Sequence, residues 1–312
     1  MITIDTEIDK SRDWTVSKAE SFTSVLKGIP DILTPLLARY DAKPTYLLSP
    51  EVIRCYDCVS TLKSLSDCEL GTHLHGDFVE PEMRVRKLAG ERSKEMQSSY
   101  PASLEYLKLE NLTNSFKNAF LFTPKSFRAG RFGAGNRTIM FLEKLGYLVD
   151  SSVTPGLIWK NAEGIANFVH APIFPYFPSL NNINEPGGSK VLEVPVTISS
   201  NFITRQLNII GGRFAILNKF IGQHWLRPSF ESTYNMLKLC KQLIKNVKSE
   251  AVVLNMMFHS VELIPGASPY CQTDLEVKFF LSRITSVLDF ISKHGGSFCT
   301  LSELYPIFKR GL

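Results

Sequence analysis

The sequence predicts an α/β fold, in which a mostly parallel sheet curls toward a barrel and helices cover its outside. Short apolar, strand-like runs alternate with segments of helical periodicity along the whole chain. Polar clusters follow directly after four of these runs, as they do where barrel strands end at a catalytic face. The 312 residues, 44% of them hydrophobic, suffice for one large core, so we expect a single domain over residues 1–312.

The N-terminal third contains three strand-like runs and one helix. Met1–Asp5 has the character of a strand, and Pro44–Leu48 and Cys68–His73 are the next two short apolar runs. Between the first two runs, Phe22–Tyr40 carries apolar residues three and four positions apart. This spacing predicts a helix with one apolar face.

The middle third is predicted to contain two helices and three strands. Tyr100–Phe120 is expected to form a long helix with a proline in its first turn, and Asn136–Leu145 a shorter helix that a glycine ends. The strand-like runs of this part are Lys125–Arg128, Tyr147–Ser151 and Val191–Val196.

The last third places the strand-like run Ala251–Phe258 between two helices, Ser229–Val247 and Thr273–His294. The second helix opens with the capping box T-D-L-E and stops at a pair of glycines. Two segments interrupt the alternation, at about 155–190 and about 201–228. We expect both to be insertions over the rim of the barrel, where long loops commonly bind substrate.

The heptapeptide G-T-H-L-H-G-D, Gly71–Asp77, carries the strongest chemical signal in the chain. His73, His75 and Asp77 lie two residues apart directly after an apolar run. In an extended backbone such side chains point the same way and can converge on one point. Two imidazoles and a carboxylate suit a catalytic zinc ion with one position left for water.

Further polar groups follow other strand-like runs. Asp5 and Glu7 share one face of the opening I-T-I-D-T-E, Arg128 lies in F-R-A-G-R-F-G, and His259 lies in M-M-F-H-S. Taken alone, the two acids read as solvated charges, His259 as a core histidine, and Arg128 with Arg131 as structural ion-pair residues. Strand ends on one face of a barrel are neighbours, however, so together these groups predict one metal-dependent hydrolase site.

The composition excludes several classes of function. The net charge is +5 and no long Lys/Arg run occurs, so we expect no nucleic-acid partner. No leader pattern is evident, and no stretch approaches the roughly 20 apolar residues of a membrane span, so a cytoplasmic protein is expected. The C-Y-D-C pair Cys55–Cys58 lacks companions for a zinc or redox site, so all six cysteines are predicted to be reduced.

Six motifs, in order, resemble those of the polysaccharide deacetylase family, also called carbohydrate esterase family 4. They are I-T-I-D-T-E at the first strand, E-L-G-T-H-L-H at 69–75, F-R-A-G-R-F-G at 127–133, G-Y-L-V-D-S-S-V at 146–153, L-E-V-P-V at 192–196, and M-M-F-H-S-V-E-L at 256–263. The nearest subgroup is the one linked to surface-polysaccharide and O-antigen biosynthesis. The resemblance implies a distorted (β/α) barrel with fewer than eight regular strands and with rim insertions.

The resemblance also implies roles for individual residues. Asp5 matches the family's general base, and His73 matches its first metal-binding histidine. The family's second acid is missing directly after Asp5, so the metal role passes to Glu7. Asp77 stands at the family's second histidine position, so either Asp77 or His75 completes the metal site. We favour His75, because imidazole is the more usual zinc ligand.

The remaining roles fall on later motifs. Arg128 matches the arginine that orients the base, and His259 matches the closing histidine that acts as general acid. Arg131, Phe132 and Tyr176 are expected to bind substrate. The rim aromatics either stack on sugar rings or serve as ordinary packing.

The resemblance therefore implies a carbohydrate de-N-acetylase that uses Zn²⁺ or another divalent metal to hydrolyse an N-acetyl or related acyl group on a sugar. We expect a carbohydrate substrate, with nucleotide- and lipid-linked sugars included, and a place in surface-polysaccharide biosynthesis. The altered metal motif leaves two alternatives open: a catalytically silent saccharide-binding protein on the same fold, and a metal-free amide hydrolase. The sequence indicates no particular oligomeric state.

Overall fold

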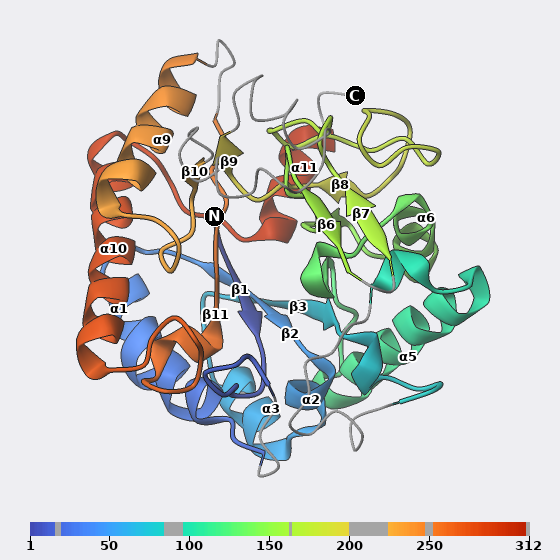
Figure 1. Cartoon of the computed structure of the whole chain (residues 1–312), viewed down its shortest axis with the longest axis horizontal. Helices are drawn as coiled ribbons and strands as arrows, with labels where there is room; N and C mark the ends of the chain where they lie inside the picture. The colour runs from blue at the N-terminus through green and yellow to red at the C-terminus, as the bar shows by residue number, and fades with distance from the viewer. Residues whose placement is uncertain (16–19, 84–95, 162–163, 200–223, 247–251, 310–312) are drawn as a thin grey trace.

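Seven parallel strands form a curled sheet at the centre of the computed structural model, and they make an incomplete barrel (Figure 1). The structure describes residues 1–312 except 16–19, 84–95, 162–163, 200–223, 247–251 and 310–312. The strand order is β11-β1-β2-β3-β4-β5-β8. The strands are β1 (Ile2–Thr6), β2 (Pro44–Leu48), β3 (Glu69–Leu74), β4 (Ser126–Ala129), β5 (Val149–Asp150), β8 (Leu192–Glu193) and β11 (Met256–His259). The predicted distorted barrel with fewer than eight regular strands is confirmed.

Loop segments rather than a strand bridge the gap between β8 and β11. The N–H of Asn255 donates to Thr197 Oγ1, and the N–H of Thr197 donates to the Asn255 carbonyl at 3.1 Å. The N–H of Leu226 donates to the Thr197 carbonyl at 2.9 Å, and the N–H of Met257 donates to the Leu226 carbonyl at 3.2 Å. Residues that follow β8 and β10 (His224–Trp225) therefore occupy the place where an eighth strand would close the barrel.

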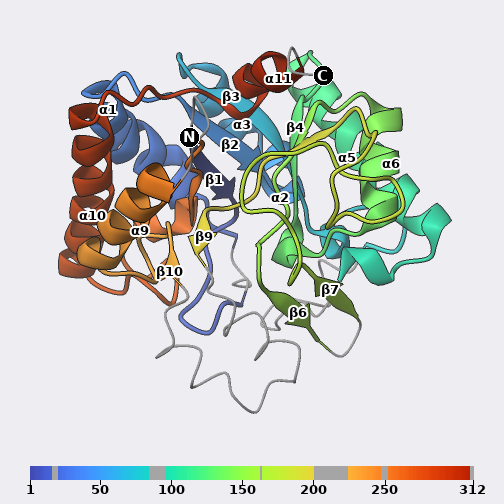
Figure 2. The same ribbon diagram turned by 90° about the horizontal axis from the view of Figure 1, so that it is seen from above.

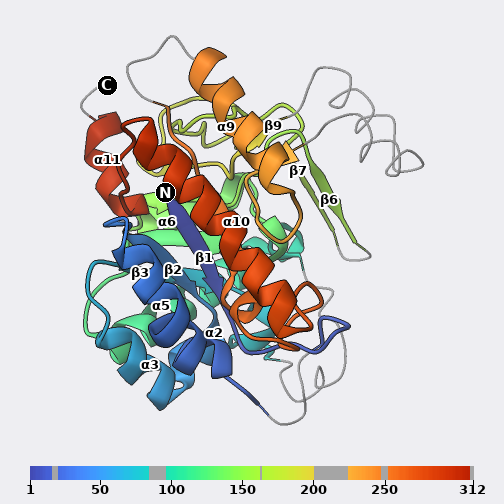
Figure 3. The same ribbon diagram turned by 90° about the vertical axis from the view of Figure 1, so that its left-hand side faces the viewer.

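Helices cover the outside of the sheet, and Figure 3 shows α10 running along it beside α9. The helices are η1 (Ser24–Leu33), α1 (Thr34–Ala38), α2 (Pro50–Arg54), α3 (Tyr56–Lys63), α5 (Ala102–Phe120), α6 (Asn136–Leu145), α9 (Thr233–Asn246), α10 (Asp274–Lys293) and α11 (Leu301–Lys309). Every residue of β1 and β2 is buried, because helices and the opposite wall of the barrel cover both faces. Within the described part of the chain, no helix is both long and apolar enough to cross a membrane.

Most predicted elements form close to their expected bounds. β2 and α6 match the sequence prediction residue for residue. The helix predicted over Phe22–Tyr40 forms as two successive helices, η1 and α1, in a segment where Pro30 and Pro35 each lack an N–H donor. The strand predicted over Ala251–Phe258 begins only at Met256. The sequence analysis did not predict α2, α3 or α11.

The two ends of the sheet are covered differently. At the amino ends of the strands, the N–H of Leu301 in α11 donates to Thr45 Oγ1 at 3.0 Å. Figure 2 shows the hairpin of β6 (Ile158–Lys160) and β7 (Ile165–Asn167) on the side of the molecule opposite α11, where the strands have their carboxyl ends. The predicted insertion at 155–190 contains this hairpin. The second predicted insertion, 201–228, lies mostly outside the described residues, which resume with β10.

Candidate metal centre and active site

The sheet register brings the predicted polar groups to one edge. Asp5 on β1 is level with His259 on β11, and His73 on β3 is level with Arg128 on β4. All these strands are parallel, so their carboxyl ends lie at the same edge of the sheet. Clusters that are distant in sequence therefore meet in space.

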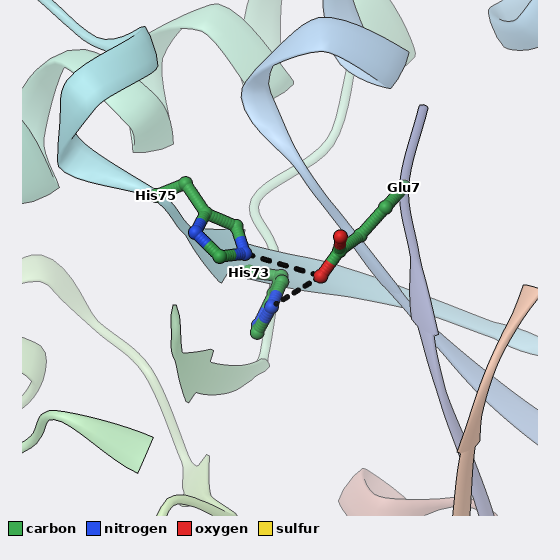
Figure 4. Close-up of side chains that lie close together, drawn as sticks. All are labelled: Glu7, His73 and His75. Carbon is green, nitrogen blue, oxygen red and sulfur yellow. Dashed lines mark hydrogen bonds and ion pairs between the residues drawn. The ribbon is translucent and has the colours of Figure 1, made fainter. Parts of the chain in front are cut away.

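Glu7, His73 and His75 converge on one point at this edge (Figure 4). One atom of each, a carboxylate oxygen or an imidazole nitrogen, lies within 4.8 Å of the others. Glu7 Oε1 is 3.2 Å from His73 Nε2 and 3.1 Å from His75 Nε2. A single carboxylate oxygen therefore faces both imidazoles.

The two histidines are oriented by different contacts. The Nδ1–H of His73 donates to the Arg128 carbonyl at 3.0 Å, which leaves Nε2 as the atom that would hold a metal. The ring of His75 packs edge-on against that of His73, with 4.7 Å between ring centroids. Gly130 passes close behind it, because a Cβ there would lie 2.9 Å from His75 Nδ1 and 2.5 Å from the Leu74 carbonyl oxygen. His75 Nδ1 has no hydrogen-bond partner among the described residues, so packing against Gly130 positions this edge of the ring, while Nε2 faces Glu7.

The electrostatics of the group suit metal binding. Burial alone would raise the pKa of Glu7, but the ammonium of Lys10 and the two histidines hold this pKa well below its usual value. Burial lowers the pKa of His75 to about 4, so its ring is neutral near neutral pH. Burial also opposes the charged form of His73, but Asp5 and Glu7 outweigh it and raise the His73 pKa. An ionised carboxylate and a neutral imidazole are the forms that bind metals, so Glu7 and His75 are already in these forms, whereas His73 would release a proton to an arriving ion.

The donor set fits a divalent ion. Two imidazole nitrogens and one carboxylate oxygen lie together in a buried position, which is the ligand chemistry of catalytic zinc sites. Among the described residues, Glu7, His73 and His75 are the group of His, Cys, Asp and Glu side chains that could hold a metal. Asp77 is not part of this group and lies buried in the 3-10 turn η2 (Gly76–Phe78). The geometry thus favours His75 over Asp77 as third ligand.

Arg128 is completely buried behind this group and holds Asp5 in place. One terminal nitrogen donates to Asp5 Oδ1 at 2.6 Å, and the other donates to Thr3 Oγ1 at 2.7 Å. Its Nε–H donates to the Ser151 carbonyl at 2.8 Å. The guanidinium is therefore fixed by contacts on three sides, and its position fixes that of the Asp5 carboxylate.

The second oxygen of Asp5 lies between the metal-capable group and His259. Asp5 Oδ2 is 3.8 Å from His73 Nε2 and 3.8 Å from His259 Nε2. Burial by itself would raise the pKa of Asp5, but Arg128 chiefly, and then the two histidines, bring it below its usual value. Asp5 is thus an ionised carboxylate that lies close to both the metal-capable group and His259.

His259 has two charged neighbours at its other nitrogen. The Nδ1 of His259 lies 3.0 Å from Glu262 Oε1, and a terminal nitrogen of Arg227 lies 3.2 Å from the same Nδ1. Arg227 also lies 3.5 Å from Glu262 Oε1. A carboxylate oxygen accepts hydrogen bonds, so the Nδ1–H of His259 donates to Glu262. The Nε2 of His259 then faces Asp5. The His–Glu pair sets the orientation of the ring.

Three residues at this site were missed by the sequence analysis. Glu262 follows His259 by three residues inside M-M-F-H-S-V-E-L, and that spacing on a 3-10 turn could have identified it. Lys10 and Arg227 lie outside every motif, in segments without periodicity. Nothing in the sequence indicated that they reach the site.

Six aromatic side chains form an arc that begins beside Arg128 and ends at His259. The centroid distances along this aromatic arc are 5.3 Å for Phe132–Trp159, 6.3 Å for Trp159–Trp225, 6.0 Å for Trp225–Phe230, 5.2 Å for Phe230–Tyr270, 5.5 Å for Tyr270–Trp14 and 5.1 Å for Trp14–His259. Trp14 and Phe132 have positive φ values, 62° and 55°, although neither is glycine. Strained backbone of this kind concentrates at functional sites.

The predicted substrate-binding residues lie in different places. Arg131, with a φ of 53°, precedes Phe132 at the exit of β4, and its charge adds to burial in lowering the pKa of His75. Phe132 lies 6.0 Å from the guanidinium carbon of Arg128. The hydroxyl of buried Tyr176 donates to the Ile183 carbonyl at 2.6 Å within the 155–190 insertion. Arg131 and Phe132 therefore adjoin the metal-capable group, whereas the polar atom of Tyr176 is engaged inside the insertion.

Two of the similar solved structures have TM-scores of 0.50 or more and share the fold of this chain. A putative glycoside hydrolase/deacetylase from Parabacteroides distasonis has a TM-score of 0.58 and 9% identity over 99% of this chain and 70% of its own. A GH57-type branching enzyme from Pyrococcus horikoshii has a TM-score of 0.50 and 10% identity over 98% and 69% of the two chains. The Xyl-CE4 domain of a xylanase from the hindgut metagenome of Trinervitermes trinervoides has a TM-score of 0.45 and 12% identity over 100% and 90%. No protein-family model matches the sequence, and no curated protein does.

Proposed function

We propose that the protein is a metal-dependent carbohydrate de-N-acetylase, a hydrolase that removes an N-acetyl or related acyl group from a sugar. The observation that carries this proposal is the convergence of Glu7, His73 and His75 with Asp5 and His259 at one edge of the sheet. The fold shared with the Parabacteroides protein and the six sequence motifs support it. The same motifs support a place in surface-polysaccharide biosynthesis.

Asp5 is the general base of the proposed reaction. A divalent ion held by Glu7, His73 and His75 would supply positive charge that polarises the acyl carbonyl and makes a neighbouring water more acidic. The oxygen of that water attacks the acyl carbon while Asp5 Oδ2 takes a proton from the water. Arg128 keeps the carboxylate ionised and aimed at the water through its 2.6 Å contact with Oδ1.

His259 is the general acid. When the bond between the acyl carbon and the sugar nitrogen breaks, the Nε2–H of the protonated ring donates its proton to the leaving amine. Glu262 accepts from Nδ1 and so stabilises the ring while it carries a positive charge. The products are the free amino sugar and a carboxylate.

The surroundings of the site suit a sugar. Within the aromatic arc, Phe230 is exposed and Trp14, Trp159 and Tyr270 are partly exposed, so the apolar face of a sugar ring could pack against them. Phe132 begins this arc beside Arg128, and Arg131 adds a positive charge at the same strand exit. We therefore propose Phe132 and Arg131 as substrate-binding residues, and include sugars linked to nucleotides or lipid phosphates among the substrates.

The test combines metal analysis with turnover. We expect the purified protein to bind about one zinc or other divalent ion, visible by anomalous scattering at the metal edge, and to release acetate from N-acetylated sugars. The variant Asp5→Asn should abolish turnover and keep the metal, whereas Asp289→Asn, on the outer helix α10, should behave as wild type.

Each alternative predicts a different outcome. Acetate release that persists after the metal is removed would support a metal-free amide hydrolase. Sugar binding without turnover in the metal-loaded protein would support a silent saccharide-binding protein. Full activity of the Asp5→Asn variant would exclude Asp5 as the base.

A further inference from the structure

Lys10 occupies the side of Glu7 that the histidines leave open. Its Nζ lies 3.3 Å from Glu7 Oε2, while Oε1 faces His73 and His75. Lys10 is itself buried, and its backbone N–H is fixed by the Ala267 carbonyl at 2.9 Å. A positive charge therefore lies on the carboxylate that the proposed metal ion needs.

Glu51 is a second buried carboxylate near Lys10. It is 4% exposed, and neither of its oxygens has a hydrogen-bond partner among the described residues. The N–H of Ser49 donates to the Thr6 carbonyl at 2.9 Å, so the chain leaves β2 for α2 directly beside the end of β1 and Glu7. Burial raises the pKa of Glu51, and the largest opposing influence is the charge of Lys10.

A divalent ion bound at Glu7 would make the ion pair between Glu7 and Lys10 electrostatically unfavourable. A divalent ion between Glu7 and the histidines would share one carboxylate with the Lys10 ammonium, and the two positive charges would repel each other. A lysine ammonium moves readily, because it is a point charge on a flexible four-carbon stem. Burial of a carboxylate without a partner is unfavourable, so Glu51 gains stability from any cation that approaches it.

We propose that Lys10 exchanges partners, binding Glu7 in the absence of a divalent ion and Glu51 in its presence. Lys10 then competes with the ion for the Glu7 carboxylate, and Glu51 is the carboxylate that receives the displaced ammonium. This inference rests on the proposed metal function of Glu7. It differs from a role in which Lys10 merely holds Glu7 in position, because the two roles predict opposite effects of removing Lys10.

The test measures zinc affinity of the full-length protein by competition with a chromophoric chelator at one fixed pH. We expect Lys10→Met to bind zinc at least about fivefold more tightly, and Glu51→Gln at least about fivefold more weakly. The matched controls are Lys43→Met and Glu303→Gln, which alter the ion pair, 3.0 Å long, at the other end of the sheet. Both controls should stay within about twofold of wild type.

The outcomes separate this inference from the proposed function. Failure of the wild-type protein to bind zinc or another divalent ion would refute the metal centre itself. Tight wild-type binding that weakens in Lys10→Met would show that Lys10 positions Glu7, and would overturn the exchange. If Glu51→Gln does not fold, a crystal structure of the zinc-loaded wild type decides. It should show the Lys10 ammonium within about 4 Å of Glu51, and an ammonium still on Glu7 would overturn the exchange.

Discussion

Replacement of Glu262 by glutamine isolates the contribution of the His–Glu pair to the proposed acid step. Glutamine keeps the shape of the side chain and removes its charge. In the native site, Glu262 Oε1 lies 3.0 Å from His259 Nδ1, and the whole side chain is buried. The loss of charge also frees Arg227, whose nitrogen lies 3.2 Å from the same Nδ1. Arg227 would then donate to an unprotonated Nδ1, which disfavours the charged ring that the acid step requires.

The size of the effect follows from the hydrogen bond that is lost. A hydrogen bond to a charged group contributes about 1.5–3 kcal/mol, and solvent does not weaken this one, because Glu262 is completely buried. Since about 1.4 kcal/mol changes a rate tenfold, we expect kcat to fall by about 10- to 100-fold. KM should change little, because Glu262 contacts the catalytic ring and not the proposed sugar site.

The assay is acetate release under saturating and limiting substrate, with metal content measured in the same samples. The matched control is Glu231→Gln, which makes the same exchange at a second His–Glu pair, 3.4 Å from His224 Nδ1. The control should retain wild-type kcat. If Glu262→Gln is folded and metal-loaded and its kcat stays within about twofold of wild type, the assigned pairing of His259 is wrong.

Two further variants test the packing behind His75 and the protonation of a buried pair of acids, Asp150 and Glu193. Gly130→Ala should lower zinc affinity about tenfold or more in a chelator competition, because its Cβ would lie 2.9 Å from His75 Nδ1, whereas Gly188→Ala, with open space around it, should not. Asp150→Asn should raise the melting temperature at pH 8 and leave it unchanged near pH 4. Burial raises the pKa of both Asp150 and its neighbour Glu193, so the folded state keeps protons that the unfolded chain loses as the pH rises. The contribution of this pair to the stability of the wild type therefore falls by about 1–3 kcal/mol as the pH rises, and equal melting temperatures of the two proteins at pH 8 would refute this.

Elements with strong local signals could be predicted from the sequence. The run P-T-Y-L-L forms β2 over its whole length, because every one of its side chains is buried and apolar or satisfied within the core. The capping box predicted the start of α10, where Thr273 Oγ1 accepts from the N–H of Glu276. The short helix α2 escaped prediction, because its 5 residues span little more than one turn and carry no detectable period.

Parts of the site depended on backbone detail that no local pattern records. The choice between His75 and Asp77 was open, because it turns on where the extended chain ends. β3 runs to Leu74, His75 is still extended with φ −105° and ψ 100°, and the turn begins at Gly76. Asp77 therefore lies in that turn and outside the group that Glu7, His73 and His75 form. Lys10 and Arg227 were missed for a different reason, since each reaches the site through long-range packing of an irregular segment.

The two acids at the end of β1, Asp5 and Glu7, explain how the proposed site would separate proton transfer from ion binding. Asp5 is paired with Arg128, whose guanidinium is held by Ser151 and Thr3 as well as by Asp5, so its cation cannot leave. Glu7 is paired with Lys10 through a single contact of 3.3 Å on a flexible stem. The proposed base would therefore keep its charge and position whether or not an ion is bound, whereas Glu7 would exchange one cation for another. In this proposal, an arginine and a lysine that pair with carboxylates two residues apart give the end of one strand a fixed proton acceptor and an exchangeable metal ligand.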